Sequence, residues 1–233
     1  MRCKIDKTFY SKYDNLNNQM FFYYLKKQYG FDIKEDKVIG KGTYGKVFDG
    51  YYNNKNVVFK IQDLYKKYDE TTESRINNIL EEVENQRKIS LVKRASDGKP
   101  CTTQIYDCLF LRYDGNGKII KIMDKNSNYM DFLGNFIIVI EKGVLSLTDF
   151  IKMNDDYKKL NNIMYKVFEN YETMILKTNI INIDAKSPNV ILIKKNDPRI
   201  IDFGNNFVTT DIENIVNTKK INKLMIKKKY ISK

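Results

Sequence analysis

The stretch Asn182-Ile183-Asp184-Ala185-Lys186-Ser187-Pro188-Asn189 is followed by a short apolar run and then by Ile200-Ile201-Asp202-Phe203-Gly204. Its polar side chains suit the tasks of phosphoryl transfer. Asp184 can accept or orient the proton of an attacking hydroxyl, and Lys186 can neutralise the transferred phosphoryl group. Asn189 and Asp202 offer the hard oxygen ligands that Mg²⁺ prefers. Asp-Phe-Gly alone is common by chance, but an Asp-x-Lys-x-x-Asn motif whose Asp lies eighteen residues before it is not.

A glycine-rich stretch lies upstream, where Gly40, Gly42 and Gly45 precede Val47 in the run GKGTYGKV. Glycines let backbone N–H groups approach phosphates because no Cβ stands in the way. A hairpin turn or a dinucleotide-binding fold can also give this pattern, and the dinucleotide fold needs a helix directly after the glycines. The residues that follow, KVFDGYY, alternate like a strand instead. This favours a loop folded over a nucleotide.

Lys60 lies inside the apolar run Val57-Val58-Phe59-Lys60-Ile61. A buried lysine is costly unless an anion meets it, so nucleotide phosphates and a carboxylate are its expected partners. The alternative is a lysine on an edge strand with a solvated head. The predicted helix that follows supplies Glu81, Glu82 and Glu84. We favour Glu82, which precedes the apolar Val83, and Glu81 and Glu84 stay open.

The predicted elements are mostly strands in the first part of the chain and mostly helices in the second, which predicts an α+β fold of two lobes. The strands are predicted within 37–52, 56–64, 102–125 (with a turn at Asp114–Gly117), 136–140, 189–193 and 199–203. The helices are predicted at 12–29, 73–94, 146–153, 157–178 and from Thr210 onward.

Taken together, the motifs resemble the protein kinase superfamily over roughly residues 34–208. The glycine loop, the strand lysine, the helix glutamate, the catalytic loop and Asp-Phe-Gly occur in the family's order. The resemblance implies a bilobal kinase-like fold that binds ATP and Mg²⁺. In this interpretation residues 1–33 are an N-terminal helical extension, 34–141 the N-lobe and 142–233 a shortened helical C-lobe.

The resemblance also implies roles for single residues. Asp184, Lys186, Lys60 and Glu82 would be catalytic, and Asn189 and Asp202 would bind the metal. Ile140 would be the gatekeeper before a hinge of Glu141-Lys142-Gly143. The Glu141 carbonyl and the Gly143 amide would hydrogen-bond adenine, with Val47 and Phe59 close by. The glycines, Lys60, Asn189 and Asp202 complete the expected nucleotide site.

Two departures from the family pattern matter. Asn182-Ile183 replaces the usual His-Arg pair, and without that arginine we expect no switching by phosphorylation near Thr209 and Thr210. The missing histidine leaves the packing of the catalytic loop open. Only 29 residues follow Gly204, so the usual peptide-docking helices do not fit. Such shortening resembles atypical, viral and bacterial-effector kinases.

The leading interpretation is a Ser/Thr protein kinase, because tyrosine kinases and the aminoglycoside- and choline-type kinases lack a lysine at the position of Lys186. A kinase for a non-protein substrate is a second reading. The main alternative is a pseudokinase, a nucleotide-binding or purely structural scaffold that acts through partners. The shortened lobe leaves room for an activating protein partner.

Composition narrows the function classes further. The absence of histidine excludes mechanisms that use His, and the net charge of +12 attracts anions. An acidic protein substrate is therefore expected, although coding bias alone can give many lysines. Nucleic acid is disfavoured, since the lysines are scattered without an aromatic stacking platform. Two apolar sets in residues 210–233, with lysines between them, are expected to close the small lobe or dock an acidic protein.

Three cysteines, Cys3, Cys101 and Cys108, form no C-x-x-C pair, so neither a disulfide framework nor a zinc site is predicted. No apolar run has the length of a membrane span, and the N-terminus has no signal-peptide core. We therefore expect an intracellular, cytoplasmic protein.

Overall fold

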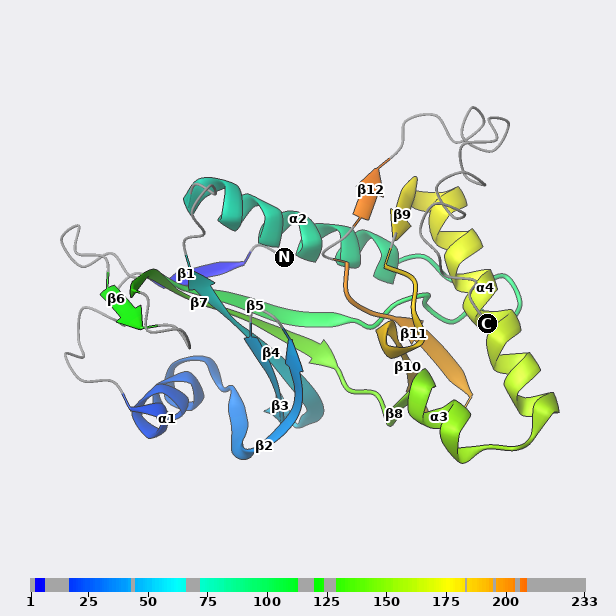
Figure 1. Ribbon diagram of the computed structural model, residues 1–233, viewed down its shortest axis with the longest axis horizontal. Coiled ribbons are helices and arrows are strands. Elements are labelled where there is room, and N and C mark those ends of the chain that lie inside the picture. Colours follow the sequence, from blue (N-terminus) through cyan, green and yellow to red (C-terminus); the bar gives the residue numbers. More distant parts are fainter. Residues whose placement is uncertain are drawn as a thin grey trace. The chain divides into compact units, whose positions relative to one another are not determined.

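The computed structural model describes residues 3–6, 17–42, 45–65, 72–112, 120–123, 129–182, 184–194, 196–203 and 206–208 (Figure 1). Ile183, Gly204, Thr209, the turn at Asp114–Gly117 and the segment 210–233 lie outside these residues. The chain divides into two compact units, one of 1–90 and 103–144 and the other of 91–102 and 145–233. Residues 91–102, within the predicted N-lobe range, therefore belong to the second unit.

The first unit is built on a seven-stranded sheet, in which β6 pairs with β7 beside the main path β1-β5-β7-β4-β3-β2. All pairs are antiparallel except β1 with β5. The strands are β1 (Lys4–Asp6), β2 (Asp32–Gly42), β3 (Gly45–Tyr52), β4 (Lys55–Tyr65), β5 (Ile105–Arg112), β6 (Ile120–Met123) and β7 (Tyr129–Glu141).

Alternation along the strands builds two hydrophobic cores, because successive side chains of a strand point to opposite faces. Phe59 and Ile137 belong to one core, which also contains Leu25 of helix α1 (Asn18–Tyr29). Ile138 belongs to the other, which contains Val83 of helix α2 (Thr72–Ser90). The two helices therefore cover opposite faces of this sheet (Figure 1).

Helix α1 has clear start and stop signals. Asn17 caps its first turn by accepting a hydrogen bond from the Met20 N–H, and Gly30 ends it in the left-handed conformation at φ 71°. The predicted helix over 12–29 is thus found from Asn18, with residues 12–16 outside the described part. Within the predicted helical extension, however, Lys4–Asp6 form a strand paired with β5. Periodicity could not show this strand, because three residues carry too little pattern.

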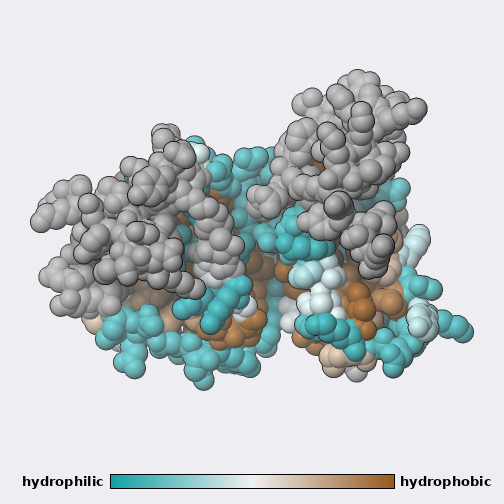
Figure 2. Space-filling view, viewed as in Figure 1, coloured by the Kyte–Doolittle hydropathy of each residue, from teal (hydrophilic) through white to brown (hydrophobic). Residues whose placement is uncertain are grey.

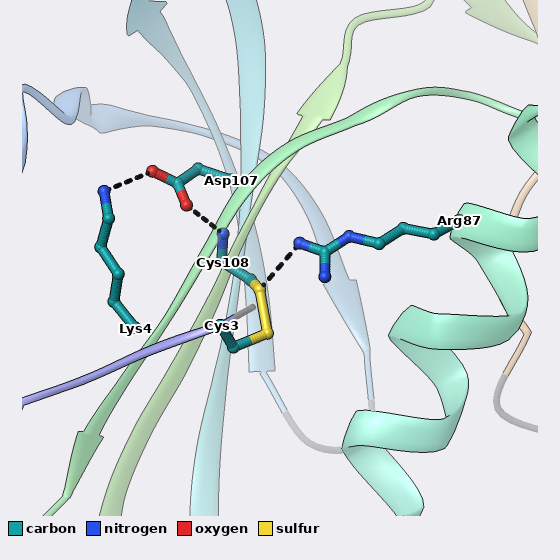
Figure 3. Close-up of a disulfide and its surroundings, with 5 residues drawn as sticks. All are labelled: Cys3, Lys4, Arg87, Asp107 and Cys108. Carbon is teal, nitrogen blue, oxygen red and sulfur yellow. Dashed lines mark hydrogen bonds and ion pairs between the residues drawn. A yellow bond between two sulfur atoms is a disulfide. The ribbon is translucent and has the colours of Figure 1, made fainter. Parts of the chain in front are cut away.

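The prediction of no disulfide is wrong, because Cys3 and Cys108 are joined across 105 residues of sequence (Figure 3). The bond fastens the start of β1 to the adjacent strand β5. Next to it the Lys4 Nζ lies 3.0 Å from Asp107 Oδ2, and Arg87 Nη2 of α2 lies 3.1 Å from Cys108 Sγ. Cysteine spacing could not predict the bond, since the pairing depends on which strands become neighbours. Cys101 is a buried free thiol.

In its described residues, the second unit combines two helices with two small sheets. Helix α3 (Leu147–Met153) and helix α4 (Tyr157–Thr178) pack with β10 (Val190–Ile193) around a core of Phe150, Val167 and Leu192, among others. One sheet has the order β11 (Asp197–Ile200), β10, β8 (Leu145–Ser146). The other pairs β9 (Ile180–Asn182) with β12 (Asn206–Val208). A 3₁₀ turn, η1 (Ser187–Asn189), precedes β10.

Arg94 ties segment 91–102 into this unit from a fully buried position. Its guanidinium donates to both carboxylate oxygens of Asp97, to Asp197, to the Asn170 side chain and to the Pro198 carbonyl. A buried guanidinium needs such partners because an unpaired buried charge is costly. The segment is thereby held against α4 and β11.

Helix α4 matches its predicted bounds of 157–178, and the α+β class is confirmed. Helix α2 ends four residues earlier than predicted, at Ser90. Among the described residues, no helix is long and apolar enough to cross a membrane.

Candidate functional site

The glycine-rich stretch forms the end of the β2–β3 hairpin. Gly42 pairs with Gly45 and Gly40 with Val47, and the tip at residues 43–44 is outside the described part. A strand, β3, follows the glycines, so the dinucleotide-fold alternative, which needs a helix there, is excluded.

Two of these glycines differ in how closely neighbouring atoms approach them. A Cβ on Gly45 would lie 2.0 Å from the Ile61 carbonyl oxygen, so the neighbouring strand β4 demands glycine there. A Cβ on Gly40 would meet only Val47, at an ordinary 3.5 Å. Packing within the chain therefore does not explain Gly40, whereas the approach of a ligand would.

Lys60 lies on β4, an interior strand paired with β3 on one side and β7 on the other. The edge-strand alternative is therefore wrong. Its Nζ lies 2.8 Å from Glu82 Oε1, and the two side chains are 24% and 10% exposed. Glu84 is exposed and pairs with Lys88, and Glu81 is exposed. Of the three glutamates left open by the sequence, Glu82 is thus the partner of Lys60.

The predicted position of Phe59 beside adenine is wrong. Phe59 is fully buried in the core under α1, on the sheet face opposite Lys60. Val47 pairs with Lys60 across the strands, and Val58 follows the alternation onto the face of Lys60. The predicted gatekeeper Ile140 packs against the α2 core of that face.

The predicted hinge begins at the end of β7. The Glu141 N–H donates to the Gln104 carbonyl at 2.9 Å, and its carboxylate accepts from the Gln104 N–H at 3.2 Å. Lys142 reaches Asp49 with its Nζ, and Gly143 follows. All predicted site residues from Gly40 to Gly143 thus belong to the first unit.

In the second unit, Asp184, Lys186 and Asn189 come together around one carboxylate. Lys186 Nζ lies 2.6 Å from Asp184 Oδ2, and Asn189 Nδ2 donates to the same oxygen and to the Asp184 carbonyl, each at 3.0 Å. Asn189 is buried at the end of η1. Since its amide nitrogen makes these bonds, its Oδ1 is the atom suited to a metal ion.

Asp202 is an exposed residue that directly follows an ordered segment. The Ile201 N–H donates to the Asn189 carbonyl at 2.8 Å, which fixes the residue before Asp202 to the residue that ends η1. Asp202 itself has φ 65°, in the left-handed region that non-glycine residues seldom occupy. Strained backbone of this kind clusters at functional sites.

The sequence prediction gave Asn182 no role. It is buried, its Oδ1 accepts from the Asp184 N–H at 2.9 Å, and its Nδ2 donates to the Asp202 carbonyl at 3.1 Å. The signal was its position two residues before Asp184, where it was noted only as a departure from the family. Asn182 keeps the two segments of the site together.

Tyr171 of α4 is a second residue that the sequence did not single out for the site. Its hydroxyl oxygen is buried and has no hydrogen-bond partner among the described residues. Burial, and then the charge of Asp184, raise the pKa of Tyr171 to about 12. The phenol therefore stays neutral around pH 7 and adds no charge near that carboxylate.

No cluster of three or more metal-binding side chains occurs among the described residues. Such a cluster consists of His, Cys, Asp or Glu side chains, so a site of one asparagine and one aspartate is a different kind of site.

Comparison with known proteins gives no family for the chain. No protein-family model matches it, and no curated protein matches it significantly.

Proposed function

We propose that this chain is an ATP- and Mg²⁺-dependent phosphotransferase that acts on a Ser or Thr hydroxyl of a protein. The observation that carries the proposal is the cluster of Asp184, Lys186 and Asn189. A carboxylate, an ammonium and an amide serve three different needs of phosphoryl transfer: a proton acceptor, charge neutralisation and metal binding.

The first unit supports the proposal with a nucleotide-binding half. The Lys60–Glu82 pair keeps an ammonium at a defined place on an interior strand. In the proposed role it meets the ATP phosphates, and Gly40 lets the β2–β3 hairpin approach them. Glu82 contributes by orienting Lys60, since a 2.8 Å charge-assisted hydrogen bond restricts its position.

The donor set of the second unit fits Mg²⁺. The amide oxygen of Asn189 and the carboxylate of Asp202 are hard oxygen ligands, and Mg²⁺ commonly takes one or two such ligands together with phosphate oxygens. When bound, the ion would neutralise charge on the phosphates.

The remaining chemistry belongs to the chain's own side chains. Asp184 Oδ accepts the hydroxyl proton while the substrate oxygen bonds to the γ-phosphorus of ATP. The bond from that phosphorus to the bridging oxygen breaks, and ADP leaves. Lys186, 2.6 Å from Asp184 in the structure, supplies a positive charge for the transferred group.

The test is the transfer of labelled γ-phosphate from ATP to a basic and to an acidic protein acceptor, with Mg²⁺ present. We expect Asp184→Asn to lower turnover at least 100-fold, while nucleotide binding followed by thermal shift stays within about threefold of wild type. Asp149→Asn, at an exposed carboxylate on α3, is the matched control. Equal activity of the wild type and Asp184→Asn would reject the proposal.

The same assay distinguishes an active kinase from the pseudokinase alternative. A pseudokinase would bind ATP, with or without Mg²⁺, yet show no transfer above the Asp184→Asn background. A chain whose melting temperature neither nucleotide nor Mg²⁺ changes would exclude the kinase and the nucleotide-binding pseudokinase, and would leave a purely structural scaffold.

A further inference from the structure

Asn182 joins the two segments that carry the site of the second unit. It ends β9 and pairs with Asn206 of β12, and the residue is buried, with 6% of its surface exposed. Its amide accepts from the Asp184 N–H and donates to the Asp202 carbonyl. One short side chain thus contacts the backbones of two residues that lie eighteen positions apart.

We propose that Asn182 is a positioning residue for phosphoryl transfer, holding the Asp184 and Asp202 backbones in one fixed relation. This inference rests on the proposed function. Asn182 has no part in the chemistry, because both of its hydrogen bonds go to main-chain groups.

The amide group suits this role for a stereochemical reason. An asparagine side chain has an acceptor and a donor on one rigid plane, two bonds from its Cα. An ionised aspartate has the same shape but only acceptors, so it keeps the bond to the Asp184 N–H and repels the Asp202 carbonyl. Leucine also has a similar shape and forms neither bond.

The bond to Asp202 has a particular consequence for its carboxylate. Asp202 has φ 65°, a conformation that the surrounding structure must hold. Fixing its carbonyl fixes the peptide plane that follows Asp202 and limits rotation at its backbone. The direction of the Asp202 side chain, and with it the ability to bind Mg²⁺, therefore depends on Asn182.

The experiment measures the Mg²⁺ requirement in the full-length chain. For wild type, Asn182→Asp and Asn182→Leu, the Mg²⁺ concentration that gives half-maximal turnover is determined at saturating ATP. The Mg²⁺-dependent rise in melting temperature with ATP is measured in parallel and needs no catalysis. Asn161→Asp, at an exposed asparagine on α4, controls for the added charge.

We expect Asn182→Asp to raise the half-maximal Mg²⁺ concentration at least fivefold and to lower kcat more than it raises the KM for the protein substrate. The control should stay within twofold of wild type. Asn182→Leu tests the two bonds together and should be at least as impaired. If Asn182→Leu fails to fold, the result for Asn182→Asp alone tests the inference.

Two results would overturn the inference. The first is an Asn182→Asp variant that loses thermal stability but has an unchanged Mg²⁺ requirement. This result would show that Asn182 has only a structural role. The second is no change at all. In both cases an active wild type leaves the proposed function standing, whereas a wild type without nucleotide binding or transfer rejects both.

Discussion

At the scale of single residues, Lys60 matters both for folding and for the proposed activity, because it forms an ion pair with Glu82. Its members are 24% and 10% exposed, so removing one leaves the other poorly solvated. Glu84, two residues after Glu82 on α2, is exposed instead and forms an i,i+4 bridge with Lys88. Breaking the ion pair of Glu82 should therefore cost more stability than breaking that of Glu84.

We predict that Lys60→Met lowers the free energy of unfolding by about 1–3 kcal/mol, because it leaves the mostly buried Glu82 carboxylate without the Lys60 ammonium. It should also lower phosphoryl transfer strongly, if Lys60 meets the phosphates. Urea unfolding and the transfer assay measure the two effects. Glu84→Gln should cost under about 0.5 kcal/mol, and a Lys60→Met variant as stable as wild type would contradict the buried pairing.

Asp49 gives a pH dependence at the residue scale. It is 1% exposed, and the Nζ atoms of Lys142, Lys37 and Lys34 lie 2.6, 3.1 and 3.7 Å from its carboxylate. Burial raises the pKa of Asp49, but Lys142 and then the other two lysines outweigh burial and lower it from 3.8 to about 2.

A carboxyl group whose pKa is lower in the folded than in the unfolded state stabilises the folded protein at pH values above the unfolded-state pKa. This stabilisation is lost as the pH falls through the folded-state pKa. We predict that Asp49→Asn costs about 1–2 kcal/mol at pH 7, allowing for partly solvated lysines. The gap to wild type should shrink between pH about 5 and about 2. Urea unfolding across that range measures it, and a gap that widens in acid would refute the assignment.

At the scale of elements, the β2–β3 hairpin contains two glycines with different roles. The fold needs Gly45, whereas Gly40 would be needed only by a ligand. A Cβ at Gly45 collides with the Ile61 carbonyl, whereas a Cβ at Gly40 fits. We predict that Gly45→Ala lowers the free energy of unfolding by at least about 1 kcal/mol. Gly40→Ala should leave it within about 0.5 kcal/mol.

Nucleotide binding gives the second readout for the hairpin. Gly40→Ala should weaken ATP binding several-fold, as seen by calorimetry, because its methyl group takes the space of the phosphates. If Gly40→Ala binds ATP like wild type, the hairpin has no nucleotide contact at this position.

Strand β1 is held to β5 by a covalent link as well as by backbone pairing. Three residues pair with β5, and the disulfide to Cys108 adds a tether across 105 residues. We predict that Cys3→Ser lowers the free energy of unfolding by about 2–4 kcal/mol under oxidising conditions. Reductant should lower wild-type stability to the same level.

The controls for this prediction use the other thiol. Cys101 is buried and unbridged, so a Cys101→Ala variant should keep its full response to reductant. A Cys3→Ser variant should show none. Wild-type stability that reductant leaves unchanged would mean that the tether does not form in solution, as expected in a reducing compartment.

At the scale of the molecule, the dominant property is a net charge of +12. Hydrophilic side chains cover much of the described surface on the face shown in Figure 2. Each unit has its own hydrophobic core, so this charge is not needed to hold either unit together. It is available for long-range attraction of acidic partners.

We predict that kcat/KM for an acidic protein substrate falls roughly tenfold between about 50 and 250 mM NaCl, because salt screens such attraction. A neutral peptide with the same acceptor residue should change less than about twofold. Equal salt dependence for the two substrates would show that the charge plays no part in recognition.

The sequence by itself determined the α+β class, the bounds of α4 and the strand that follows the glycines. These features depend on local periodicity and turn residues, which act over a few positions. It also predicted the residues of the second-unit cluster, since Asp184, Lys186 and Asn189 lie within six positions of one another. Short spacing of this kind leaves the chain little freedom to separate them.

Only the tertiary structure decided the contacts between distant segments. It selected Glu82 across 22 positions from Lys60 and joined Cys3 to Cys108. It also gave Asn182 its contact with Asp202. Each of these depends on strand order, register or helix rotation. Those are fixed by packing of the whole unit, and no local pattern in the sequence encodes them.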